Sequence, residues 1–147
     1  MKLVAEASIE IQAPMQRVWE VLVKPQYINQ WDDMPDNYDY RNELAFGTQI
    51  TWQQSADSFT RLTVVGMEPG KLFRLALYRS VWGNTVAPDA ITYSYSITQE
   101  SDKVKLSVAI GDFSILPDGE KYLNASKEFA EPALQKIKAL ALNDSVI

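Results

Sequence analysis

Apolar and polar residues alternate strictly over the first segment of the chain, residues 4–12. Every second position is apolar and the positions between are polar: Ala5, Ala7, Ile9 and Ile11 against Glu6, Ser8, Glu10 and Gln12. This period of two is typical of an antiparallel strand with one buried and one exposed face. It predicts a first strand that ends at Ala13-Pro14.

The pattern changes to helical spacing directly after this strand. Apolar residues recur three or four positions apart as far as Val23, which predicts a helix. Pro14 suits the first turn of that helix, because a proline there has no N–H to leave unpaired. Lys24-Pro25 ends the helix, and the apolar spacing from Tyr27 to Trp31 predicts a second short helix.

From about Gly47 onward the pattern is again that of strands, separated by polar or Gly/Pro-containing turns. The predicted strands cover residues 48–54, 59–67, 72–78, 91–98 and 104–110, with a weaker further strand at 38–44. Residues 80–89 follow no strand pattern and are expected to be irregular. Together with the first segment, this gives six to seven strands.

The strand at 72–79 carries apolar residues on both faces, so its orientation needs a decision. With Phe73, Leu75 and Leu77 inside, no polar group is buried. The opposite orientation buries the guanidinium of Arg74, which would then need an anionic partner. We therefore expect Arg74 to face outward.

The last part of the chain, residues 117–142, follows a helical period and predicts one long helix. Its apolar stripe is broad and consists of Leu123, Phe129, Ala130, Ala133, Leu134, Ile137, Leu140 and Ala141. Pro132 lies inside this helix, where it removes one backbone hydrogen bond and predicts a kink near residues 128–132.

This order of elements predicts a single α+β domain over residues 1–147. One apolar face of the antiparallel sheet needs a cover, and the C-terminal helix is the large apolar element available to supply it. We expect the sheet to curve around that helix. Such an arrangement leaves a cavity between sheet and helix, with the mostly apolar lining that is usual for small-molecule sites.

The segment at 9–22, IEIQAPMQRVWEVL, followed by Pro25 and Trp31, resembles the opening of START-like (SRPBCC, helix-grip) proteins. It is most similar to the branch related to the activator of heat-shock protein 90 ATPase, as is the segment VGMEPGKL at 65–72. With the long C-terminal helix, the resemblance covers essentially the whole chain. It implies an incurved antiparallel sheet, an apolar cavity and roles from lipid or aromatic ligand binding to polyketide cyclisation, without a fixed catalytic motif.

Composition restricts the chemistry. The chain has no cysteine and no histidine, which excludes disulfides, thiolate metal sites and histidine-based triads. Its net charge of −5 disfavours nucleic-acid binding, which needs clustered Lys and Arg. No apolar stretch has the length of a membrane span, and a charge at Glu6 interrupts any signal-peptide core. We expect a cytoplasmic protein that needs no metal and no cofactor.

Aromatic and apolar residues on the elements that border the expected cavity are the candidate ligand-binding residues. They are Trp31, Trp52, Leu75, Leu77, Trp82, Tyr93, Tyr95, Phe129, Ala133 and Leu134. Core packing is the alternative for Trp19, Tyr93 and Tyr95. Trp82 lies in a Gly- and Pro-containing loop, where an aromatic side chain can act as a lid over the cavity mouth.

Three hypotheses on function follow. The first is binding of an apolar or aromatic small molecule or lipid between the sheet and the C-terminal helix. The second is a polyketide-cyclase- or hydrolase-like enzyme that uses carboxylates such as Glu68, Asp112 and Glu128 together with tyrosines; no catalytic residue is assigned. The third is a chaperone-associated interaction module that docks through the acidic segment at 32–43. The sequence indicates no oligomeric state.

Overall fold

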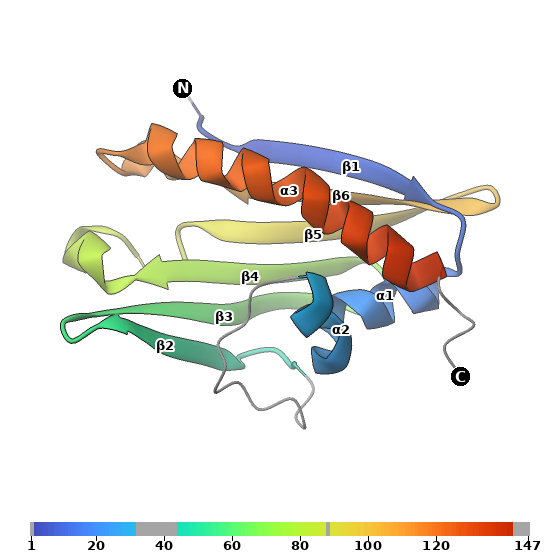
Figure 1. Cartoon of the computed structure of the whole chain (residues 1–147), viewed down its shortest axis with the longest axis horizontal. Helices are drawn as coiled ribbons and strands as arrows, with labels where there is room; N and C mark the ends of the chain where they lie inside the picture. Colours follow the sequence, from blue (N-terminus) through green and yellow to red (C-terminus); the bar gives the residue numbers. More distant parts are fainter. Residues whose placement is uncertain (1, 32–43, 88, 143–147) are drawn as a thin grey trace.

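The computed structural model of the chain describes residues 2–31, 44–87 and 89–142 (Figure 1). The elements in chain order are β1 Ala5–Ile11, α1 Met15–Val23, α2 Pro25–Trp31, β2 Gln49–Ser55, β3 Ser58–Glu68, β4 Leu72–Arg79, η1 Ser80–Thr85, β5 Thr92–Glu100, β6 Lys103–Gly111, η2 Phe113–Ile115 and α3 Gly119–Leu142. Each strand and helix expected within the described residues is present. The two short 3₁₀ helices, η1 and η2, were not predicted.

The strands form one six-stranded sheet in the order β1-β6-β5-β4-β3-β2. All neighbouring strands are antiparallel, which confirms the predicted sheet. The predicted turn at Glu68-Pro69-Gly70 is also present, with Gly70 at a φ of 77° that favours glycine. The further strand predicted at 38–44 falls almost entirely outside the described residues.

Helix α3 crosses one face of the sheet, over β1, β6 and β5, as Figure 1 shows. Its buried side chains include Ala130, Ala133, Leu134, Ile137 and Ala141, all members of the predicted apolar stripe. Burying one helix face against the concave side of the sheet removes the apolar surface of both elements from water. This confirms the predicted curved sheet that wraps around a C-terminal helix.

Helices α1 and α2 lie near the C-terminal end of α3 (Figure 1). Arg17 of α1 joins them to it by hydrogen bonds. Nη2 of Arg17 donates to the carbonyl oxygen of Leu140 at 2.8 Å, and Nη1 donates to the hydroxyl of Tyr27 at 2.8 Å. The last carbonyls of a helix lack intrahelical donors and carry partial negative charge. The guanidinium therefore caps α3 from α1.

Strand β4 has the expected orientation. Phe73 and Leu75 are buried, whereas Arg74 is exposed and its Nε donates to the hydroxyl of Ser94 at 3.2 Å. Ala76 shares the outer face with Arg74 but is buried, because Thr63 and Thr92 flank its small side chain on the neighbouring strands.

Within the described part of the chain, no helix combines the length and the hydropathy needed to cross a membrane.

Candidate functional site

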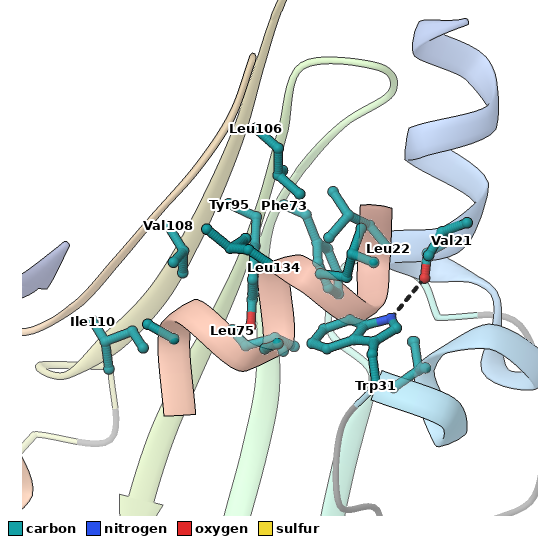
Figure 2. Close-up of a cluster of buried hydrophobic side chains, with 14 of the residues drawn as sticks. Val21, Leu22, Trp31, Phe73, Leu75, Tyr95, Leu106, Val108, Ile110 and Leu134 are labelled. Atoms are coloured by element: carbon teal, nitrogen blue, oxygen red, sulfur yellow. Dashed lines mark hydrogen bonds between the residues drawn. The ribbon is translucent and has the colours of Figure 1, made fainter. Parts of the chain in front are cut away.

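Aromatic rings connect the sheet to the short helices beneath the C-terminal half of α3. Trp31 stands edge-on to Tyr95, with ring centroids 5.6 Å apart, and Tyr95 stacks on Phe73 at 6.2 Å. Phe73 in turn meets the edge of Trp19 at 6.3 Å. Figure 2 shows several of these side chains converging with Leu75 and Leu134. The interior here is a packed aromatic core.

The position of Trp31 is fixed by one buried hydrogen bond. Its Nε1 donates to the carbonyl oxygen of Val21 at 2.8 Å (Figure 2). The residue four positions after Val21 is Pro25, which has no N–H and cannot close a helical bond to that carbonyl. The indole of α2 therefore supplies the donor that the backbone of α1 lacks.

A pocket of about 180 Å³ opens beside Trp31, against the middle of α3. It is lined by Trp31, Glu128, Phe129, Pro132, Ala133 and Lys136. Three of these residues, Trp31, Phe129 and Ala133, were predicted from the sequence. An apolar cavity of about 150 Å³ in another protein accepts benzene, so this pocket has room for a small aromatic compound or a short alkyl group.

Four other predicted residues lie directly behind this pocket or beside it. The rings of Tyr93 and Phe129 meet edge-on, with their centroids 5.9 Å apart. Leu75 in β4 lies opposite Tyr93 in β5. Tyr95 and Leu134 are each about 1% exposed. Tyr95 supports Trp31 from the sheet side, so these residues form the wall behind the pocket rather than its surface.

Trp82, Leu77 and Trp52 do not line this pocket. Trp82 packs edge-on against Tyr122 at 5.5 Å, and its Nε1 donates to the Tyr122 hydroxyl at 3.2 Å. Tyr122 precedes Phe129 by seven positions, which is about 10 Å along the helix. Leu77 lies opposite Leu62 in β3. Trp52 lies opposite Thr60 in the edge strand β2, and its side chain is outside the described part.

Larger hollows exist elsewhere, but no aromatic side chain in the described part of the chain lines them. One of about 410 Å³ lies on the outer face of the sheet, and its lining combines serines, such as Ser94 and Ser107, with aliphatic side chains, such as Leu72 and Val108. Another of about 440 Å³ lies near the end of α3 and includes Glu10, Lys103 and Lys138. Both lack aromatic residues and all of the predicted ligand-binding residues. The smaller pocket beside Trp31 is therefore the candidate site, because an apolar ligand gains most from aromatic walls.

Of the carboxylates considered as acid–base groups, Asp112 has a structural role. Its Oδ1 accepts from the backbone N–H groups of Leu3 and Ser114, at 2.9 Å each. These hydrogen bonds, Leu3 first, lower the pKa of Asp112 to about 2. Glu68 is exposed at the end of β3, and Glu128 is the one of the three that lines the pocket.

Within residues 2–31, 44–87 and 89–142, no three or more acidic side chains are grouped so that they could hold a metal ion.

Sequence reasoning missed one residue of the pocket and underrated another. Lys136 was not singled out, and Pro132 was considered for its kink, which could open a portal or only shape the helix, and not as a lining residue. Both lie on one ridge of α3 with Glu128, at intervals of four residues. This four-residue spacing around Pro132 was the feature of the sequence that could have identified Lys136 as a lining residue.

The antiparallel sheet, the two short helices after β1 and the long helix across the concave face define a START-like, helix-grip protein. The family model described as "Activator of Hsp90 ATPase homolog 1-like protein" matches residues 12–141. The chain belongs to this family. No curated protein sequence matches it.

Solved structures share the fold at low sequence identity. Protein MLL2253 from Mesorhizobium loti is 17% identical with a TM-score of 0.69, over 93% of this chain and 95% of that one. The Aha1 dimer from Colwellia psychrerythraea is 13% identical with a TM-score of 0.65, over 96% and 98%. DynU16, from the dynemicin biosynthetic locus, is 15% identical with a TM-score of 0.63, over 95% of this chain. The chain spans about half of DynU16, 47% of its length.

Proposed function

We propose that this protein binds an apolar or aromatic small molecule in the pocket between Trp31 and the middle of α3. The observation that carries the proposal is the pairing of two aromatic side chains, Trp31 and Phe129, with the small, buried Ala133 in one pocket. Aromatic rings supply large contact areas at little cost in conformational freedom.

The size of the pocket restricts the ligand. At about 180 Å³, it lies below the range of about 300–1,000 Å³ that drug-sized ligands occupy. A small aromatic compound of one ring or two fused rings, or a short alkyl group, fits, whereas a long acyl chain would require the side chains behind Trp31 to move. Membership of a family whose fold accommodates ligands between sheet and helix supports this assignment.

The two other hypotheses have less support. For an enzyme, Glu128 is the one candidate carboxylate at the pocket, and its side chain is exposed. An exposed carboxylate lacks the water-excluded surroundings in which a general acid or base usually works. For a chaperone-associated module, the acidic segment at 32–43 lies outside the described residues.

Native mass spectrometry of gently purified protein tests the proposal. We expect an added mass that disappears on denaturation, and a loss of that mass in Ala133→Trp, whose larger side chain fills the pocket. Ala125→Trp is the matched control, because Ala125 is exposed on the same helix outside the pocket. Circular dichroism checks that the variants fold, since overpacking typically costs about 1–3 kcal/mol.

Ala133→Leu, a smaller enlargement, serves if Ala133→Trp does not fold. Two results would contradict the proposal. One is an adduct carried equally by the wild type and a folded Ala133 variant. The other is a bare wild-type chain that takes up no added naphthalene.

A further inference from the structure

A backbone carbonyl on the helix wall of the pocket lacks its helical donor. In an α-helix, the N–H of each residue donates to the carbonyl four positions earlier. Pro132 has no N–H, so it cannot donate to the carbonyl of Glu128. The proline ring also crowds that carbonyl and turns it away from the helix axis.

The two residues that flank this carbonyl, Glu128 and Pro132, both line the pocket. The carbonyl points along the helix from Glu128 towards Pro132, and the rings of Phe129 and Trp31 line the same pocket. A hydrogen-bond acceptor therefore lies next to two aromatic walls. A carbonyl removed from water without a donor costs free energy, so a ligand that covers this oxygen gains from bringing an N–H or O–H with it.

Elsewhere in this chain, a carbonyl that has lost its helical donor to a proline accepts a hydrogen bond from another group. The carbonyl of Val21 also has a proline, Pro25, four positions later, and it accepts instead from the indole Nε1 of Trp31 at 2.8 Å. Figure 2 shows this bond between the indole of Trp31 and the backbone of Val21. An aromatic N–H is thus an effective partner for a carbonyl whose helical donor a proline has removed.

We propose that the pocket selects aromatic ligands that carry a ring N–H, and that this N–H donates to the carbonyl oxygen of Glu128. The ring packs between Trp31 and Phe129, and the bond to Glu128 fixes its orientation. The inference rests on the proposed binding function and narrows it to nitrogen-containing aromatic compounds of about indole size.

Indole and indene form a matched pair of probes, because they share a bicyclic shape and differ in the ring N–H. An apolar pocket without an acceptor would favour indene, since indole must give up a hydrogen bond to water. We expect wild-type protein to bind indole about tenfold more tightly than indene, as one net hydrogen bond allows. Isothermal titration or NMR measures the two dissociation constants.

Pro132→Ala is the decisive variant. Alanine restores the N–H at this position, so the carbonyl of Glu128 regains its helical partner and is no longer offered to the ligand. The preference for indole should disappear, and indene should bind at least as tightly as indole. Pro117→Ala is the control, because Pro117 lies in the turn before α3, outside the pocket, and should keep the full preference.

The outcomes separate the two proposals. Equal affinity of wild type for indole and indene would overturn the selection of a ring N–H while leaving the binding function intact. A preference that persists in a folded Pro132→Ala variant would overturn the role of the Glu128 carbonyl. Failure of both probes to bind the wild type would contradict the binding site itself.

Discussion

Trp31 of α2 meets Tyr95 of β5 edge-on, with 5.6 Å between the ring centroids. Both side chains are buried, at about 2% and 1% exposure, yet Trp31 is also a wall of the pocket. One residue thus joins the candidate binding site to the centre of the sheet. Occupation of the pocket should therefore be detectable in the core, and changes at Trp31 should affect stability as well as binding.

Replacing Trp31 with phenylalanine should destabilise the protein by about 1–3 kcal/mol, because the buried carbonyl of Val21 loses its donor. Trp19→Phe is the control for the smaller ring, since Trp19 is a second buried indole that contacts Phe73. Urea denaturation followed by circular dichroism gives both free energies of unfolding. Equal losses in the two variants would contradict a specific role for the Trp31–Val21 bond.

Replacing Arg17 with leucine should destabilise the protein by about 1–3 kcal/mol, because the C-terminal carbonyls of α3 lose a charged donor. Arg17→Lys should restore only part of this loss, since an ammonium group cannot reproduce the planar fork. Arg74→Ala, at an exposed arginine, should change stability by less than about 0.5 kcal/mol. Wild-type stability in Arg17→Leu would show that the cap contributes little.

Acid should weaken the fold through Asp112. Its pKa is lowered from 3.8 to about 2 in the folded protein, so its contribution to stability is present above about pH 4 and is lost as the pH falls towards 2. Asp112→Asn should flatten the pH dependence of the urea midpoint in this window. Asp102→Asn, in the exposed β5–β6 turn, is the control. Parallel pH curves for wild type and Asp112→Asn would contradict the assignment.

Removing the hydroxyl of Tyr122 should loosen η1. This oxygen accepts from Nη1 of Arg79 at 2.7 Å and from Nε1 of Trp82 at 3.2 Å, so it holds Ser80–Thr85 against α3. In Tyr122→Phe, hydrogen exchange at the Trp82 indole and in η1 should become several-fold faster, while the β5–β6 ladder stays unchanged. Unaltered exchange in η1 would contradict this role of the Tyr122 hydroxyl. The same variant tests the hypothesis that Trp82 acts as a lid. If it does, loosening η1 should make ligand uptake faster than in the wild type.

The sequence predicted most of the fold because its patterns are strong and local. Strict alternation in β1 and β6 leaves one possible buried face for each strand, and the broad stripe of α3 requires a sheet to cover it. The buried face of the ambiguous strand β4 was also predicted correctly, because burying the charged side chain of Arg74 would cost free energy. Such arguments compare the two faces of one element and need no knowledge of its neighbours.

The site was predicted less completely, because it depends on contacts between distant segments. Nothing in the pattern around Trp82 indicates that its indole meets Tyr122, 40 positions away. Lys136 was missed because a charged residue on an exposed helix position normally carries no function. The sequence did contain Pro25, which removes the helical donor to the carbonyl of Val21, but the donor that replaces it is the indole of Trp31, and this becomes apparent only when α2 is placed.

An NMR titration of the ¹⁵N-labelled wild-type protein with indole tests the central claim most directly. We predict saturable shifts at the Trp31 Nε1–H and at the amides of Phe129 and Ala133, and their loss in a folded Ala133→Trp variant. The absence of saturable shifts would contradict the account. Shifts confined to residues elsewhere, such as Ser94 and Ser107 on the outer face of the sheet, would contradict it equally.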